Sequence, residues 1–187
     1  MIELIMPANE LRRVLSNCVL FRGDATRPVL QCVEVAVAGS EATFTATDSY
    51  GLITEAIKVS SESEGTFLIS GDTASALIKT LDKKDTGDIA IRVDESAIEF
   101  QHGWTLPATA PDWNYPNWRE IVPEADGVQA CGPVGMGLWQ LARLAKVVGP
   151  SATGKVAAIF HITSETKPCI AMLAGGAVRV LFMPVRR

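Results

Sequence analysis

Residues 149–155 have the spacing of a glycine-rich loop that could bind a phosphate group, up to and including Lys155. Such a loop follows a strand and opens a helix, so that backbone amides and the helix N-terminus converge on the phosphate. In this chain the predicted order is reversed, because a helix precedes the loop and a strand over residues 156–162 follows it. Val156 also replaces the hydroxyl residue that would bind magnesium. We therefore expect no nucleotide site at this loop.

Other side chains that could do acid-base, nucleophilic or metal chemistry are scattered. His102 and His161 lie in or beside predicted strands of different segments, and no serine or cysteine sits on a recognisable nucleophile turn. Asp48 could be a catalytic carboxylate, although a turn-forming aspartate is much commoner. The cysteines show no metal-ligand spacing and are expected to be free buried thiols: Cys18, Cys32, Cys131 and Cys169. A small α+β enzyme using Asp48 or the loop at 149–155 stays an open alternative.

The same order of elements recurs three times: an apolar strand, one or two turn residues, an amphipathic helix, and two or three short alternating strands. The leading strands and helices are predicted, in chain order, at residues 2–5 and 9–18, 66–69 and 73–83, and 128–131 and 136–148. Gly71 and Asp72 are predicted to cap the second helix. The strands after each helix alternate with period two, as at Val33, Val35 and Val37. One-sided helices on such strands predict an α+β fold of antiparallel sheets covered on one face.

Composition agrees with a compact protein. The chain has 187 residues, of which 48% are hydrophobic, enough to bury a core in one or two small domains. The sequence contains neither a signal-peptide pattern nor an apolar stretch of membrane-spanning length, so we expect a cytoplasmic protein without a membrane partner. Prolines and aromatic residues over residues 107–123 predict an ordered connector that is neither a regular element nor a free linker.

The net charge of −4, taken alone, argues against a nucleic-acid binder. The predicted helices and their ends nevertheless carry a group of basic residues: Arg12, Arg13, Lys79, Lys83, Lys84, Arg143 and Lys146. Acidic residues concentrate in loops and at strand edges. If all three helices line one surface, that surface is positive on an acidic protein. Ordinary solvent-exposed helix faces give the same pattern, and charge alone favours that simpler interpretation.

Four short segments resemble one protein family: residues 27–33 (RPVLQCV), 46–52 (ATDSYGL), 115–123 (YPNWREIVP) and 182–186 (FMPVR). They resemble the bacterial DNA polymerase III beta subunit, the sliding clamp, which carries an ATDGHRL-like turn, an FPDYRRVLP-like linker and a VMPMRL-like C-terminus in the same order. The chain departs from these motifs at Tyr50 and Gly51, where His and Arg are usual, and in the additional Arg187.

The resemblance covers the whole chain but only part of a full clamp. Residues 1–123 resemble the middle domain, with repeats over about 1–64 and 65–106 followed by the connector at 107–123. Residues 124–187 resemble the second half of the last domain. The resemblance thus implies a shortened DNA-clamp fold, with antiparallel sheets outside and the helices on the inner face.

The resemblance also implies a function, that of a non-enzymatic processivity factor without a cofactor. Such a ring is threaded on double-stranded DNA and tethers a polymerase, with helix lysines and arginines attracting phosphates independently of sequence. Peptide motifs of the DNA polymerase and clamp loader would bind a groove whose members, by correspondence, are Leu30, Thr47, Ser49, Tyr50, Gly51, Leu52, Pro116, Ile121, Leu181, Met183, Pro184, Val185 and Arg186. A flexible methionine in an apolar trough suits aliphatic or aromatic anchors. Plain core packing is the alternative for Leu30, Ile121 and Leu181.

Assembly follows from the odd number of repeats. Rings in this family close with twelve such repeats, whereas one chain here supplies three, so the third repeat has no partner within its chain. We expect third repeats from two chains to pair about a two-fold axis, because an open strand edge invites pairing, and four chains to close a homo-oligomeric ring. The competing hypothesis is a clamp-like module that captures clamp-binding peptides, or caps another clamp, without encircling DNA.

Overall fold

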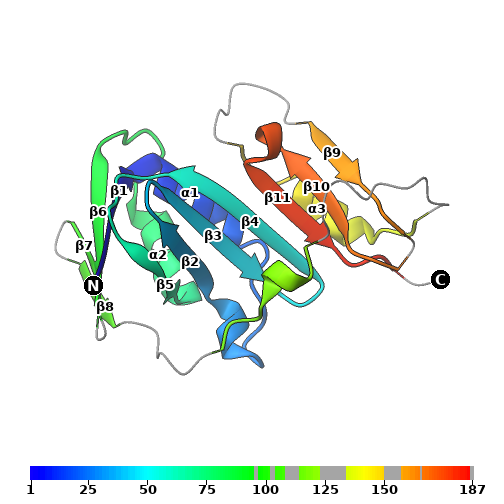
Figure 1. Ribbon diagram of the computed structural model, residues 1–187, viewed down its shortest axis with the longest axis horizontal. Coiled ribbons are helices and arrows are strands. Elements are labelled where there is room, and N and C mark those ends of the chain that lie inside the picture. The colour runs from blue at the N-terminus through cyan, green and yellow to red at the C-terminus, as the bar shows by residue number, and fades with distance from the viewer. Residues whose placement is uncertain are drawn as a thin grey trace.

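The computed structural model describes residues 1–94, 97–101, 104–107, 114–122, 134–149, 157–164 and 166–185. Within these ranges the chain is an α+β protein whose strand pairings are all antiparallel (Figure 1). The same ranges contain no helix that is long and apolar enough to cross a membrane. The predicted fold class is therefore confirmed.

The first two repeats occupy the N-terminal part of the chain. Their elements are β1 (Ile2–Pro7), α1 (Ala8–Cys18), the 3-10 helix η1 (Pro28–Gln31), β2 (Val33–Ala38), β3 (Glu41–Thr47), β4 (Gly51–Lys58), β5 (Glu64–Ile69), α2 (Gly71–Thr80), β6 (Asp88–Val93), β7 (Ala97–Phe100) and β8 (Trp104–Pro107). The helices α1 and α2 pack against each other, and α1 also contacts β1, β3 and β4. α1 buries Leu11, Val14 and Leu15 completely, as their helical spacing predicts.

The two repeats exchange their leading strands. β1, which opens the first repeat, pairs with β6 of the second, and β5, which opens the second, pairs with β2 of the first. The result is a four-stranded sheet in the order β1-β6-β7-β8 and a larger sheet that begins β5-β2-β3-β4. Neither repeat is therefore complete without the other.

The start and end of α2 differ from the predicted ones. The cap is Ser70, whose hydroxyl oxygen accepts a hydrogen bond from the Thr73 amide at 3.1 Å. Gly71 and Asp72, the predicted cap, are the first helical residues, and the acidic side chain suits the helix N-terminus. The helix ends before Lys83, because the chain is already extended directly after Thr80.

The third repeat contributes α3 (Leu138–Leu144), β9 (Ala158–His161), β10 (Cys169–Leu173), the short 3-10 helix η4 (Ala174–Gly176) and β11 (Val178–Phe182). α3 is shorter than the predicted 136–148. Its continuation is held by another helix: the Asn17 side chain of α1 accepts a hydrogen bond from the Val148 amide at 2.9 Å and donates one to the Val148 carbonyl at 2.8 Å. The predicted leading strand at 128–131 lies outside the described residues.

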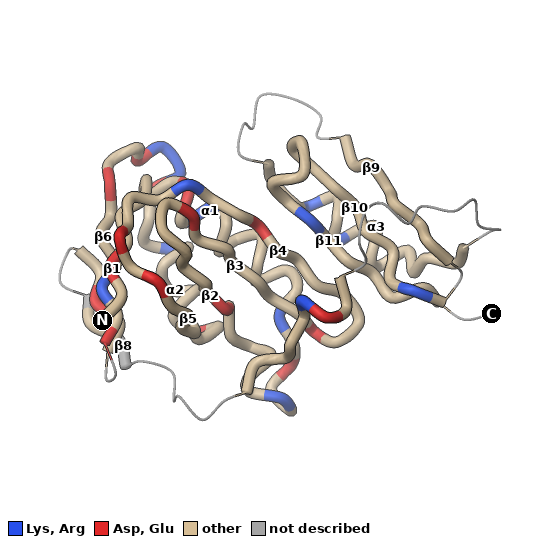
Figure 2. Tube along the Cα trace, viewed as in Figure 1, with Lys and Arg blue, Asp and Glu red and all other residues tan. Residues whose placement is uncertain are grey.

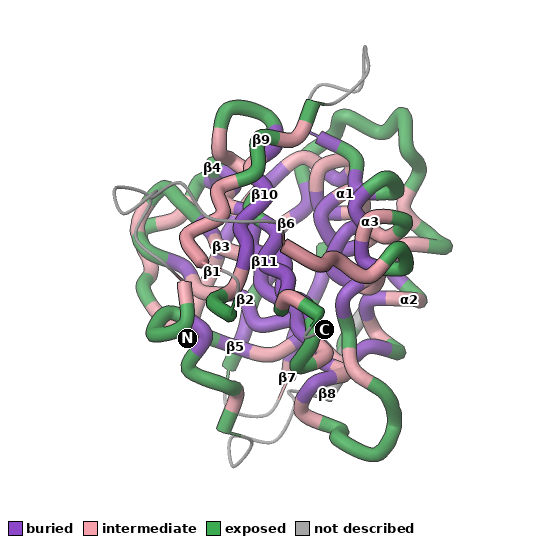
Figure 3. The backbone as a smooth tube through the Cα atoms, turned by 90° about the vertical axis from the view of Figure 1, so that its right-hand side faces the viewer, coloured by how far each residue is buried: buried purple, intermediate pink, exposed green. Residues whose placement is uncertain are grey.

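A strand pair joins the third repeat to the first. β11 pairs with β4, so the larger sheet continues to seven strands in the order β5-β2-β3-β4-β11-β10-β9. The main core is likewise shared, since Val180 and Phe182 of β11 belong to the same buried cluster as Phe44 and Leu15 (Figure 3). The connector contributes the 3-10 helix η2 (Trp118–Glu120), which packs over this junction.

A buried ion pair links α1 to β4. The Glu55 side chain is 1% exposed, and its Oε1 lies 2.5 Å from a guanidinium nitrogen of Arg13, which also pairs with Glu10 at 2.8 Å. Asn17 donates a hydrogen bond to the other Glu55 oxygen at 3.1 Å. Burial raises the pKa of Glu55 even beside Arg13. For Arg13, burial opposes the charge, but the hydrogen bond to Glu10 and the attraction of Glu55 outweigh it and raise the pKa.

Arg13→Met removes the counter-charge of this buried carboxylate, so we expect the free energy of unfolding at pH 7 to fall by about 3 kcal/mol. The loss should shrink as the pH falls, because a carboxylate with a raised pKa binds its proton in the folded state at a pH where the unfolded state does not. Chemical denaturation at several pH values measures both effects. As a control, Arg92→Met breaks the exposed pair with Glu3, and should cost at most about 1 kcal/mol. Equal losses in the two variants would contradict this account.

Candidate functional site

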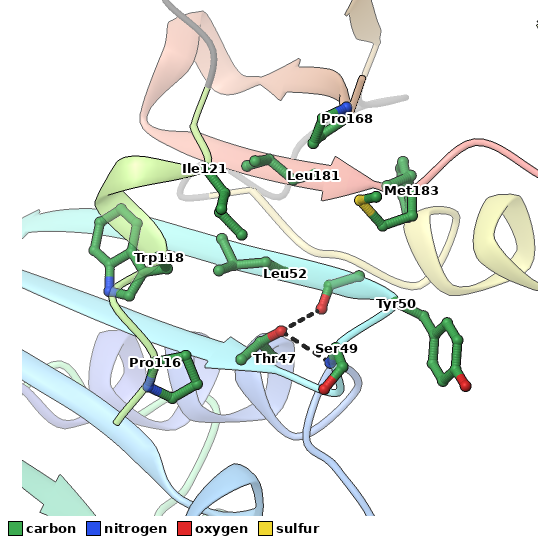
Figure 4. Close-up of a pocket in the computed structure, with 12 residues that line it drawn as sticks. Thr47, Ser49, Tyr50, Leu52, Pro116, Trp118, Ile121, Pro168, Leu181 and Met183 are labelled. Carbon is green, nitrogen blue, oxygen red and sulfur yellow. Dashed lines mark hydrogen bonds between the residues drawn. The ribbon is translucent and has the colours of Figure 1, made fainter. Parts of the chain in front are cut away.

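An apolar pocket of about 230 Å³ lies over the junction of β4 and β11 (Figure 4). Residues from the first repeat, the connector and the third repeat line it: Thr47, Ser49, Tyr50, Gly51, Leu52, Pro116, Trp118, Ile121, Pro168, Leu181, Phe182 and Met183. No single repeat can form this pocket alone. It exists because the sheet continues from β4 into β11.

The floor of the pocket is fixed by sheet register and by the connector. Leu52 and Leu181 are direct partners in the β4–β11 ladder, and both are buried in a small cluster with Trp118 and Ile170. The indole of Trp118 donates a hydrogen bond of 2.7 Å to a Glu34 carboxylate oxygen, so its polar atom is satisfied. The floor is therefore rigid and apolar.

The rim of the pocket is more exposed. Ile121 is 53% exposed, Met183 42% and Tyr50 65%. Figure 4 shows Leu52, Ile121 and Leu181 around the same space, with the Tyr50 ring extending outward at one end. Large apolar side chains left open around an apolar floor are the feature expected of a surface that binds an apolar partner.

The turn between β3 and β4 forms one end of the rim. One oxygen of Asp48 accepts hydrogen bonds from the Tyr50 and Gly51 amides at 2.9 and 2.7 Å, which makes Asp48 a turn residue and not a catalytic one. Ser49 has a φ of 76°, a left-handed conformation that favours glycine, and it stands where the clamp turn motif has glycine. Hydrogen bonds from Arg27 to the Ser49 hydroxyl and from the Ser49 amide to Thr47 help to hold it there.

The helix α3 holds the same turn from the other side. Arg143 pairs with the second Asp48 oxygen at 2.6 Å, and its Nε donates to the Leu20 carbonyl at 2.8 Å. The guanidinium also lies 4.3 Å from the ring centre of Phe21. Gln140 donates hydrogen bonds to the carbonyls of Tyr50 and Met183 at 3.4 and 3.2 Å. The third repeat thus positions the rim as well as part of the floor.

Most of the residues predicted for a partner groove lie together in this pocket. Those that line it are Thr47, Ser49, Tyr50, Gly51, Leu52, Pro116, Ile121, Leu181 and Met183. Leu30 is buried and lines a neighbouring, more polar pocket of about 480 Å³ together with Arg22 and Arg27. Pro184 and Val185 follow the lining without belonging to it, and Arg186 lies outside the described residues.

Three lining residues were not predicted. Trp118 belongs to the connector segment that resembles the clamp linker, so its motif was a usable signal. Phe182 reaches the pocket although its position in an alternating strand assigns it to the core, and it serves both. Nothing in the sequence around Pro168 indicates that it would lie here.

The predicted DNA-facing residues divide into two groups. Lys79, Lys83, Lys84 and Lys146 are exposed, and Arg12 is half-buried. Arg13 and Arg143 are instead engaged in ion pairs, with side chains only 11% and 15% exposed. Figure 2 shows acidic positions on strands of the large sheet, including β2 and β4. The charge available on the helices is therefore smaller than the sequence indicates.

The described residues offer no support for metal or acid-base chemistry. They contain no group of three or more His, Cys, Asp or Glu residues that could hold a metal ion. His161 lies half-buried in β9, whereas His102 and most of the loop at 149–155 lie outside the described residues. The described cysteines Cys18, Cys32 and Cys169 are free and buried, and burial raises the pKa of the Cys32 thiol to about 11.

Solved bacterial sliding clamps share this fold. The DNA polymerase sliding clamp from Bacillus subtilis has a TM-score of 0.77 at 16% identity, over 99% of this chain and 64% of that chain. The clamp from Pseudomonas aeruginosa has a TM-score of 0.80 at 14% identity, over 100% of this chain and 67% of that chain. A putative DNA polymerase III beta subunit from Eubacterium rectale has a TM-score of 0.80 at 9% identity, over 99% of this chain and 66% of that chain. This chain thus spans 64–67% of their length.

The sequence itself matches the family described as the DNA polymerase III beta subunit, central domain, over residues 5–116, which is more than half of the 187 residues. A comparison with curated protein sequences found no match. The family match covers both of the first two repeats, and the solved structures extend the shared fold over the third. The chain belongs to the DNA polymerase III beta subunit family, the bacterial sliding clamps.

Proposed function

We propose that this protein is a non-enzymatic processivity factor. Its pocket over the β4–β11 junction binds short apolar peptide segments of a DNA polymerase and a clamp loader, and its homo-oligomer encircles double-stranded DNA in the cytoplasm. The observation that carries this proposal is the pocket itself: an apolar, partly open site built jointly by the two ends of the chain.

The chemistry of the pocket suits a peptide more than a small polar substrate. Its floor of Leu52, Leu181 and Trp118 offers hydrocarbon and aromatic surface, and the Met183 side chain can adapt to different anchors. Polar groups lie at one end only, at Thr47 and Ser49, where they can orient a ligand. An aliphatic or aromatic side chain next to an extended backbone fits this distribution.

Lysines near the helices support the DNA-binding part of the proposal. Lys79, Lys83, Lys84 and Lys146 are exposed, and flexible ammonium groups attract phosphates without reading sequence. Asp82, Asp85 and Asp88 are exposed in the same stretch as Lys83 and Lys84, so the field of each chain is weak. A protein that must slide needs contacts of this kind, whose loss at one phosphate is replaced by gain at the next.

The length of the chain supports a ring of several copies. Because one chain spans about two thirds of the length of the solved clamps, two chains supply less material than two full clamp chains. Four chains with three repeats each supply the twelve repeats of a ring.

The second candidate is a module that captures clamp-binding peptides and never encircles DNA. The engagement of Arg13 and Arg143 in ion pairs favours it, since two of the predicted phosphate contacts are neutralised. The two functions differ in their effect on synthesis. A clamp stimulates its polymerase on primed circular DNA after loading, whereas a capture module inhibits it.

Met183→Glu tests the peptide site. A charge placed over an apolar floor lacks a partner when a peptide covers it, so we expect binding of a polymerase-derived peptide to weaken by about 30-fold or more. Isothermal titration calorimetry measures the affinity, and thermal unfolding confirms that the variant is folded. Val185→Glu is the matched control, because Val185 is 51% exposed, lies two residues along the chain and does not line the pocket. Unchanged affinity in the folded Met183 variant would place the peptide elsewhere.

Charge reversal of the exposed lysines tests the DNA-facing surface. Lys79→Glu, Lys83→Glu and Lys146→Glu combined should shorten retention on circular duplex DNA and flatten its dependence on salt, because phosphate contacts release counterions. Lys58→Glu with Lys167→Glu provides a control of the same sign in exposed residues outside the helices. Retention measured by gel filtration over a range of salt concentrations distinguishes them. Equal loss in both sets would assign the effect to net charge and not to the helices.

A further inference from the structure

The first two repeats show how a repeat of this chain becomes complete. In each, the first strand after the helix pairs on its outer edge with the leading strand of the other repeat: β2 with β5, and β6 with β1. β9 is the equivalent strand of the third repeat. Among the described residues β9 pairs with β10 alone and ends the seven-stranded sheet. Its outer edge is in the position at which the other two repeats receive a strand.

The helix layer of the third repeat is incomplete in the same way. In the first repeat, the apolar residues Leu11 and Val14 of α1 are fully buried, with α2 packed beside them. In the third, Leu138 of α3 is 81% exposed. On the neighbouring strand β9, Ile159 is 63% exposed and Phe160 40%. Apolar residues on both faces of one edge strand are thus left open, which is unusual for a finished sheet.

We propose that this surface, defined by Leu138, Ile159, Phe160 and the outer edge of β9 and here named the third-repeat face, binds the same face of a second copy of this chain. The two third repeats then complete one two-repeat unit, with each copy supplying the strand and the helix that the other lacks. The inference rests on strand topology and exposure, and it does not depend on the peptide pocket or on DNA binding.

The chain itself indicates why the occupant is a second copy. The observed partner of a repeat is another repeat of the same design, and the exchange between the first two is reciprocal, as a two-fold axis requires. Charge does not oppose such pairing. Apart from His161, the elements α3 and β9 carry one ionisable side chain, that of Arg143, and Asp48 already neutralises it. Two identical copies of the face therefore meet without strong repulsion.

Sedimentation velocity of the full chain at micromolar concentration tests the proposal. We expect species that contain even numbers of chains. Leu138→Asp should raise the dissociation constant of the pair at least about tenfold, because the carboxylate is buried against an apolar surface, and it should leave the fold intact, because the side chain is exposed within one chain. Phe160→Lys is a second variant, in which a charged residue on an edge strand opposes strand pairing.

Ile121→Asp is the control, since Ile121 is 53% exposed but lies in the peptide pocket. It should weaken peptide binding and leave the association state unchanged, so failure of the pocket and failure of the interface give different results. A monomeric wild-type chain, a trimer, or variants at Leu138 and Phe160 that associate as tightly as the wild type would each overturn the proposal. A monomer would mean that some other segment covers this face.

Discussion

The antiparallel pairing of β4 with β11 is the contact on which the rest of the structure depends. It places Leu52 opposite Leu181 and so creates the floor of the pocket from two distant parts of the chain. It also brings the third repeat into the main core, where the rings of Phe21 and Phe182 lie with centroids 6.3 Å apart. Because the sheet is continuous, the pocket and the core of the third repeat are stabilised by the same hydrogen bonds.

That pairing also explains how the chain tolerates changes in its turn motif. Arg143 and Gln140 of α3 bind the side chain and backbone of the turn, so the conformation does not depend on the residues usual in the family at positions 50 and 51. Tyr50 instead stacks edge-on against Trp139 of the same helix, with ring centroids 6.4 Å apart. The rim keeps its shape while the chemistry that it presents to a partner changes. Peptide selectivity that differs from other clamps is the expected consequence.

Sequence patterns predicted the helices α1 and α2, the alternating strands and most of the pocket. Hydrophobic periodicity locates an element and its buried face, and the clamp-like segments supplied nine of the residues that line the pocket. Strand exchange was beyond reach, because periodicity does not say which strand pairs with which. The partners of the arginines were also hidden. Glu55 lies 42 positions from Arg13, and Asp48 lies 95 positions from Arg143, so only the fold reveals that these charges are neutralised.

The loss of those two charges bears on how such a protein is retained on DNA. Electrostatic attraction grows with the number of phosphates neutralised, and this chain offers only a few exposed lysines beside exposed aspartates. If retention came from affinity alone, so weak a field would release the DNA at moderate salt. A closed ring needs no such affinity, because it is retained by topology and its weak contacts permit sliding. Under the proposed function, the burial of Arg13 and Arg143 therefore places the burden of retention on ring closure, and so on the contacts between chains.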